Sequence, residues 1–277
     1  MSAEYYRLGR DTQASIRLFS QHFLWKDQLG FNLHPRATEG WRKPEDKTIR
    51  MVADVCCGSG IWLIEEARLH PPATTRFYGF DISPSQFPPS GSVPANISFH
   101  TLDVYAPIPD SLQNAFDVVH VRLLIGLVRN GDPRPVLMHL IQMLKPGGVL
   151  QWDELDIASL FMYPPGSSPD ACNSFEKRLV SMYAGANAHY SIDWISQLSS
   201  IFAECGLADV QAIKMGKPRE GMWRFWTDNI LEAYREMARR IGGGLEEDIE
   251  KLDMERFKGV CFTYECAVAL GRKALES

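Results

Sequence analysis

Short apolar runs alternate with amphipathic segments along the middle of this 277-residue chain. Residues 62–69 and 135–144 have helical spacing, and the apolar runs lie before, between and after them. Runs of this length predict strands, and strands that alternate with helices pair in parallel. We therefore expect an α/β fold built on a parallel sheet. The predicted strands of this region are residues 49–55, 76–80, 96–102, 116–121 and 148–152.

The pattern differs on both sides of this region. Residues 11–29 carry apolar side chains at helical spacing, with Asp11 as the N-cap and Gly30 as the stop. Residues 34–48 are polar and form a linker into the main fold. Beyond Trp152, longer helical patterns predominate. The segments predicted there are helices over 173–183, 192–205, 221–240 and 246–257, and strands over 210–215 and 261–270.

The composition limits the classes of function. With 45% hydrophobic residues, the chain can bury a large core. Its net charge of -5 and its scattered lysines and arginines argue against nucleic acid or an anionic membrane as a partner, because both need clustered cations. The six cysteines contain no CxxC pair, and no run of about 18 apolar residues occurs. We expect reduced thiols, no metal, no membrane span and a cytoplasmic location.

Acidic residues stand where three predicted strands end. Asp54 is followed by the turn CCGSG, Asp81 ends the second strand and Asp103 ends the third. The carboxyl ends of parallel strands form the ligand-binding edge of such sheets. Gly58 and Gly60 allow the backbone to approach a ligand closely, and the next helix offers its first N–H groups. We expect these residues to gather around one ligand.

The residue types at this edge predict an adenine nucleoside. Asp81 suits two ribose hydroxyls, because an ionised carboxylate only accepts hydrogen bonds. Asp103 can accept from the amino group of adenine, with Ile82 and Val104 beside the ring. A dinucleotide fingerprint needs a third glycine, where this chain has Leu63, and the lysine of a phosphate-binding loop is missing. S-adenosyl-L-methionine, a ligand without phosphates, fits better.

Five motifs of the chain resemble those of class I S-adenosylmethionine-dependent methyltransferases: DVCCGSG, GFD, LD, FDVVHVR and LKPGGVLQWDE, in this order and spacing. The longer strings GFDISPSQFPP and FDVVHVRLL resemble more narrowly the fungal small-molecule methyltransferases of secondary metabolism. The resemblance is strong over residues 49–154. It implies a doubly wound, Rossmann-like sheet of seven mostly parallel strands, with a helical lid in residues 1–45, a methyltransferase core in residues 46–277 and additional helices after the fifth strand.

The same resemblance implies roles for individual residues. Asp81 would hold the ribose hydroxyls, and Arg122 would hold the methionine carboxylate because its charge is permanent. Cys56 replaces the first glycine of the motif, so it must adopt whatever backbone angle the turn needs. The implied cofactor-binding residues are Asp54, Cys56, Gly58, Gly60, Asp81, Ile82, Asp103, Val104, His120 and Arg122.

His120, Glu154 and His22 are the candidate bases, needed only if the acceptor carries a proton. Each has an ordinary structural alternative. His120 fits a hydrogen-bonded core histidine equally well. Asp153 and Glu154 could face solvent, although we favour a site role for one of them. His22 is more typical of a surface residue, yet helices such as its own close over the cofactor in this class. His189 is expected to pack.

The resemblance implies methyl transfer to an oxygen or nitrogen of a small aromatic or heterocyclic secondary metabolite, by a monomer or homodimer. Because the sulfonium methyl group is already activated, positioning and exclusion of water would supply most of the rate. Two alternatives stay open. One is a regulatory or scaffold protein that keeps the fold and acts through a protein partner, and the other is a cyclase that binds the cofactor.

Overall fold

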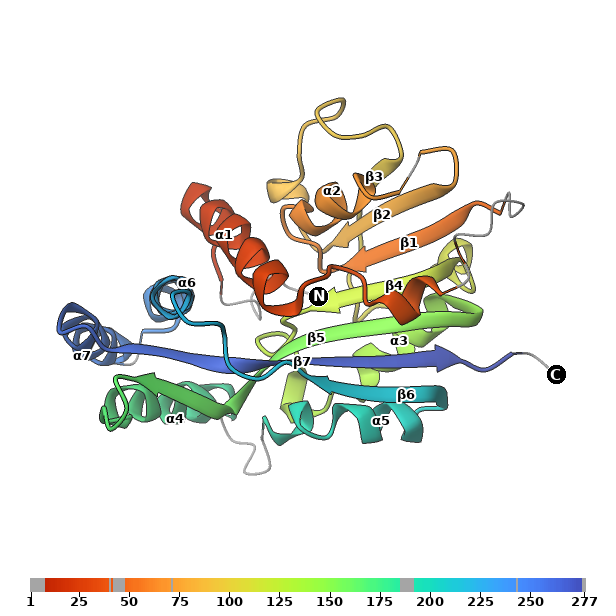
Figure 1. Ribbon diagram of the computed structural model, residues 1–277. Coiled ribbons are helices and arrows are strands. Elements are labelled where there is room, and N and C mark those ends of the chain that lie inside the picture. Colours follow the sequence, from red (N-terminus) through yellow and green to blue (C-terminus); the bar gives the residue numbers. More distant parts are fainter. Residues whose placement is uncertain are drawn as a thin grey trace.

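The computed structural model describes residues 8–39, 41, 48–70, 72–184, 192–242 and 244–275 (Figure 1). His189 lies outside the described residues. Among the described helices, none is long and apolar enough to cross a membrane.

The strands form one sheet in the order β3-β2-β1-β4-β5-β7-β6, which confirms the predicted architecture. β1 to β5 pair in parallel, and β7 runs antiparallel to both of its neighbours. The strand order reverses between β1 and β4, so the ends of these two strands border the ligand-binding edge. The strands are β1 (Arg50–Val55), β2 (Thr75–Asp81), β3 (Ile97–Thr101), β4 (Phe116–Arg122), β5 (Leu144–Tyr163), β6 (Leu207–Lys214) and β7 (Cys261–Lys273).

The fifth strand is longer than the sequence predicted. Its pairing with β4 ends at Asp153, but its pairing with β7 continues as far as Tyr163, which lies opposite Cys261. β5 continues because β7 supplies backbone partners on both sides of an irregularity between Asp156 and Phe161. We call residues 154–163 of β5 with residues 261–267 of β7 the arm. Figure 1 shows β7, in blue, running along this arm to the region of α4, α6 and α7.

The helices divide between the two faces of the sheet. Val118 belongs to one apolar cluster and Val119 to the other, as expected for a strand whose side chains alternate between two covered faces. The first cluster includes side chains of α1, α2, α4, α6 and α7, and the second those of α3 and α5. The helices are α1 (Thr12–Leu29), α2 (Ile61–Ala67), α3 (Arg134–Met143), α4 (Asp170–Ala184), α5 (Leu198–Glu204), α6 (Trp223–Ile241) and α7 (Leu245–Phe257).

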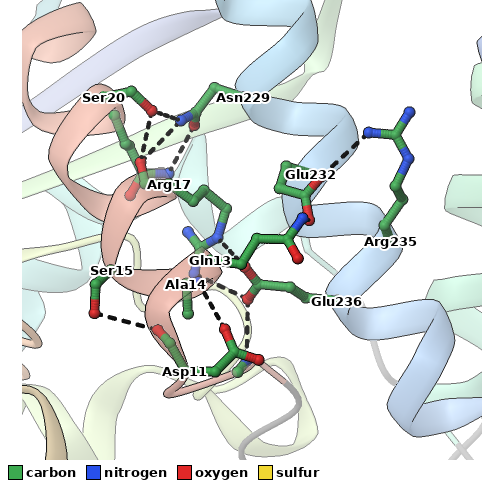
Figure 2. A network of polar contacts seen from close by, with 12 residues as sticks. Asp11, Gln13, Ala14, Ser15, Arg17, Ser20, Asn229, Glu232, Arg235 and Glu236 are labelled. Carbon is green, nitrogen blue, oxygen red and sulfur yellow. Dashed lines mark hydrogen bonds and ion pairs between the residues drawn. The ribbon is translucent and has the colours of Figure 1, made fainter.

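α1 is bound to α6 by a buried polar network (Figure 2). The helix begins after its predicted cap, Asp11, and ends at Gly30, which has a left-handed φ of 76°. Arg17 Nε donates to Glu236 Oε1 over 2.8 Å, and both side chains are 2% exposed. The backbone N–H of Gly9 donates to the other oxygen of Glu236 at 3.0 Å. Each buried charge depends on its partner, so the network fixes α1 beside the ends of β1, β2 and β4.

Candidate functional site

A cavity of about 270 Å³ lies at the carboxyl ends of β1 to β4, next to α1. Leu18 and Gln21 of α1 form part of its wall. The cavity extends from the ends of β2 and β3 to α4, α6 and the arm. All of the predicted cofactor residues except Gly60 line it. The candidate bases Glu154 and His22 do not. The predicted residues in its lining are Asp54, Cys56, Gly58, Asp81, Ile82, Asp103, Val104, His120 and Arg122.

The turn after β1 has left-handed backbone angles at three positions. Cys56 has φ 61°, Gly58 φ 53° and Gly60 φ 70°. A side chain in this conformation costs about 1 kcal/mol or more, so Cys56 adopts the angle that the motif's glycine would adopt without strain. Burial, and then the charge of Asp81, raise the pKa of the Cys56 thiol well above its ordinary value. This thiol is protonated and unreactive at neutral pH.

Gly60 has a different role from the one that the sequence suggested. It does not line the cavity, and it is the residue that precedes α2. A Cβ atom there would lie 2.3 Å from Cε1 of Phe99 on β3, which is closer than van der Waals contact allows. Gly60 is therefore required for the turn to pack against β3, rather than for the approach of a ligand.

The acids that end β2 and β3 each accept backbone hydrogen bonds beside the cavity. Asp81 Oδ2 accepts from the N–H of Gly58 at 3.0 Å, and its Oδ1 from the N–H of Ser83 at 3.1 Å. Burial raises the pKa of Asp81, and these two hydrogen bonds act against that rise. Asp103 Oδ1 accepts from the N–H of Tyr105 at 2.9 Å. These bonds fix the carboxylates in place and leave lone pairs for a ligand.

His120 is held between two carboxylates. Its Nδ1 is 2.8 Å from Asp54 Oδ1, and its Nε2 is 3.1 Å from Asp153 Oδ2. The ring is stacked on Trp62 at a centroid distance of 4.0 Å. Burial lowers the pKa of His120, but the hydrogen bonds to Asp153 and Asp54 outweigh burial and raise it. Both nitrogens lie at hydrogen-bond distance from buried carboxylates, so neither is free to approach a ligand, and this geometry does not support the predicted role of His120 as a base.

Arg122 and His22 lie next to each other at the end of β4. An Nη2 of Arg122 lies 3.4 Å from Nδ1 of His22, and its guanidinium lies 5.7 Å from the ring of Trp25. Arg122 forms no ion pair with any carboxylate of the described residues. His22 is fully buried, so the surface interpretation of this residue is wrong. Burial, together with the charge of Arg122, lowers the pKa of His22 to about 3, and it stays neutral outside the cavity.

Glu154 is buried behind the cavity wall instead of lining it, which contradicts both a solvent-facing and a base role. Its Oε1 accepts from the N–H of Leu124 at 2.6 Å and from Trp152 Nε1 at 3.0 Å, whereas Oε2 has no hydrogen-bond partner among the residues that the structure describes. The neighbouring Leu123 lines the cavity in a left-handed conformation, φ 58°. Glu154 thus holds a strained turn. Burial raises its pKa to about 8.

Far from the strand-end acids, the cavity is lined by a polar group that sequence reasoning missed: Glu176 of α4, Tyr234 of α6 and Tyr264 of the arm. The hydroxyl of Tyr264 donates to Glu176, and the two tyrosine hydroxyls are 2.8 Å apart. No local motif marks these residues, because each stands in an ordinary helical or strand pattern. Only the long pairing of β5 with β7 brings the three elements together.

The groups at the strand ends fit S-adenosylmethionine. Asp81 and Asp103 offer carboxylate acceptors for hydroxyl and amino groups, with Ile82 and Val104 as apolar surface beside them. Arg122 offers a guanidinium that forms no ion pair with a carboxylate of the described residues, and it suits the carboxylate of the methionine. The donors and acceptors that line this half of the cavity therefore match the ribose, the adenine and the amino acid of that cofactor.

Replacement of Cys56 by glycine is expected to stabilise the protein. Cys56→Gly relieves left-handed strain of about 1–2 kcal/mol, and the greater freedom of glycine in the unfolded chain offsets part of this gain, so the free energy of unfolding should rise by up to about 1 kcal/mol. Urea denaturation followed by circular dichroism measures the change. Cys57→Gly is the matched control, because Cys57 does not have a positive φ and glycine there should lower stability. A loss of stability in both variants would contradict the strain at Cys56.

Replacement of Glu154 by glutamine is expected to change the pH dependence of stability. The folded pKa of Glu154 is about 8 and its ordinary value is 4.5, so its contribution is complete below about pH 4.5 and is lost as the pH rises through 8. Glu154→Gln should therefore gain on the order of 4 kcal/mol relative to the wild type across this window. Urea titrations at several pH values test this, with Glu204→Gln, an exposed acid, as the control. Parallel pH curves for wild type and Glu154→Gln would disprove it.

Comparisons with known proteins agree with this geometry. A family model described as a methyltransferase domain matches residues 32–212, which is more than half of the chain. The methyltransferase grgD of Penicillium sp is 39% identical over 118 residues, which span 40% of this chain and 41% of that relative. The chain thus spans only about two fifths of that relative's length. The N-methyltransferase gliN of Aspergillus fumigatus is 28% identical over 90% of this chain and 87% of its own length.

Among solved structures, the cyclase SpnF has a TM-score of 0.50 and 18% sequence identity, over 90% of this chain and 81% of that one. At this identity the likeness shows the fold alone. The match of the family model over more than half of the chain shows the family. The chain belongs to the methyltransferase domain family, and S-adenosylmethionine is the cofactor that this assignment supports.

Proposed function

We propose that this protein transfers a methyl group from S-adenosylmethionine to a nitrogen or oxygen atom of a small secondary metabolite. The observation that carries the proposal is one continuous cavity with two different ends. One end gathers the acids of β1, β2 and β3, and the other has mainly apolar walls with Glu176, Tyr234 and Tyr264. A cofactor held at the first end would leave the second end for an acceptor.

The relatives support a small-molecule acceptor. The name of gliN is that of an N-methyltransferase, and its match extends over most of both chains. Nitrogen is therefore the atom that we favour. The relatives come from Penicillium and Aspergillus, which supports a fungal secondary metabolite as the substrate class. All six cysteines are free thiols, which suits a reducing, cytoplasmic location.

In this proposal, Asp81 binds the ribose hydroxyls, Asp103 the adenine amino group and Arg122 the methionine carboxylate. Bound in this way, S-adenosylmethionine supplies an activated methyl group on sulfur. The chain then has to hold the acceptor atom in line with that methyl group and exclude water. We propose that α1, with the other residues up to 45, acts as the lid over a core in residues 46–277. Leu18 and Gln21 in the cavity wall support this division.

Mass spectrometry tests the reaction directly. Purified protein is incubated with pools of fungal small molecules and with S-adenosylmethionine labelled in its methyl group. A product heavier by one labelled methyl supports the proposal, and fragmentation identifies the methylated atom. Demethylated cofactor should form in equal amount. Tight binding of cofactor without any methylated product across such pools would contradict it.

Replacement of Asp81 is expected to abolish cofactor binding. Asp81→Ala removes a carboxylate that accepts two hydrogen bonds in the proposed complex, so the Kd for S-adenosylhomocysteine should rise at least about 100-fold in calorimetry. Asp81→Asn keeps an oxygen for the turn and should lose less, about tenfold. Asp110→Ala, an exposed acid outside the cavity, is the control. An unchanged Kd in Asp81→Ala, with the fold intact, would overturn the assignment.

A second candidate function is that of a scaffold that acts through a protein partner. It is favoured by an exposed apolar stripe on α1 at helical spacing, formed by Ile16, Phe19 and Phe23, which are 64%, 54% and 38% exposed. Substitution of Ile16 and Phe19 by serine distinguishes the two functions. Loss of a co-purifying protein, without loss of methyl transfer, would assign the stripe to a partner.

A further inference from the structure

The acceptor end of the cavity contains an acid that the proposed cofactor contacts do not use. Glu176 is on α4, and the hydroxyl of Tyr264 on the arm donates to its Oε1. Tyr264 is in turn hydrogen-bonded to the hydroxyl of Tyr234 on α6 at 2.8 Å, and Phe175 is stacked on the ring of Tyr234 at 4.1 Å. Both tyrosines are buried. The carboxylate is therefore held in place at the cavity wall by three different elements.

The surroundings of Glu176 favour proton exchange near neutral pH. Burial raises its pKa to about 7, although the hydrogen bonds from Tyr264 and Tyr234 act in the opposite direction. On its own helix, the pKa of Cys172 is raised to about 12 by burial and by Glu176, so that thiol stays neutral. On α7, which packs against α4, the buried acid Asp248 is already bound to Arg178. Among the described residues, no cation is paired with Glu176.

The other groups that line the described cavity are less suited to receive a proton from an acceptor. Asp54 is bound to His120, and both nitrogens of His120 are engaged. Asp81 and Asp103 lie at the opposite end of the cavity, where backbone N–H groups bind them. Glu176 is the remaining carboxylate of the described lining.

We propose that Glu176 is the base that takes the proton of the methyl acceptor, and that this acceptor is an uncharged small molecule with an N–H or O–H group. The inference rests on the proposed function. The bond from the heteroatom to the methyl carbon forms while the bond from that carbon to sulfur breaks, and its electron pair remains on sulfur. The proton of the heteroatom passes to the Glu176 carboxylate. Tyr234 and Tyr264 are positioning residues for Glu176. An anionic acceptor is disfavoured, because the ionised carboxylate would repel it.

Binding of a matched pair of probes tests the proposal without turnover. Indole has a ring N–H, and benzofuran has nearly the same shape with an oxygen in that position. In the complex with S-adenosylhomocysteine at pH 8, indole should bind about tenfold more tightly than benzofuran in an NMR titration. In Glu176→Leu the two probes should bind about equally, whereas Glu204→Gln should keep the preference for indole. Equal binding of the probes by the wild type, no binding of indole, or an unchanged preference in Glu176→Leu overturns the proposal.

The pH dependence of the same preference separates Glu176 from a merely structural residue. The preference should rise with pH through about 7, because the ionised carboxylate is the stronger acceptor. Tyr264→Phe removes a hydrogen bond that lowers the pKa of Glu176, so it should move the midpoint to higher pH. Glu176→Gln should have no midpoint in this range. A midpoint near 7 that persists in Glu176→Gln overturns the proposal. If Glu176→Gln does not fold, the shift of the midpoint in Tyr264→Phe is the test, and an unchanged midpoint overturns the proposal.

Turnover provides a third measurement once the labelled-methyl experiment has identified an acceptor. Glu176→Gln should lower kcat about 100-fold, with KM changed only a few-fold, because the amide oxygen still accepts a hydrogen bond but cannot take the proton. Equal kcat in wild type and variant overturns the inference.

Cofactor binding tells the two proposals apart. Normal binding of S-adenosylhomocysteine without an indole preference rejects only the role of Glu176, whereas absence of cofactor binding in the wild type rejects the proposed function.

Discussion

The buried chain of Asp54, His120 and Asp153 joins the three central strands at the edge where the cavity lies. β1, β4 and β5 each supply one member, and the His120 ring gives both buried carboxylates a hydrogen-bond partner that burial would otherwise deny them. Gln151 extends the chain, because its amide donates to Asp153 and to the carbonyl of Asn32. The ends of β1 and β4 and the segment after α1 are thus held by one set of hydrogen bonds. Removal of His120 would leave the buried carboxylates of Asp54 and Asp153 without their shared partner.

The second constraint is the contact between α1 and α6. Arg17 and Glu236 are distant in sequence and almost completely buried, so α1 cannot leave α6 without breaking this buried ion pair. The same contact places Leu18 and Gln21 in the cavity wall. A lid that opens would therefore have to break this ion pair or move together with α6. The wall that α1 forms is thus coupled to α6. The same helix carries Tyr234, which lines the other end of the cavity.

The two ends of the cavity have different origins in the fold. The strand-end acids belong to the repeating α/β unit, where the reversal of strand order creates an edge for a ligand. The acceptor end depends on the arm, because β5 and β7 continue past the point where β4 stops. Helices α4 and α6 pack around this extension.

Local patterns in the sequence determined the elements and the cofactor half of the cavity. The apolar runs placed every strand except β5 within a few residues, and Asp54, Asp81 and Asp103 lie at the cavity because strand ends in a parallel sheet meet at one edge. Cys56 was expected to adopt the angle of a glycine, and it does. These inferences succeeded because they depend on neighbours in the chain and on a rule of sheet geometry.

Tertiary structure alone decided what surrounds each titratable side chain. His120 has both nitrogens engaged, Glu154 lies behind the wall and His22 is buried, although each was a candidate base. Glu176 comes next to Tyr264 only because β5 and β7 extend together and α4 packs beside them. The physical reason is that burial and hydrogen bonding to distant segments set the protonation state and access of a group. A sequence determines which side chains are present, and long-range packing determines which of them can reach a ligand.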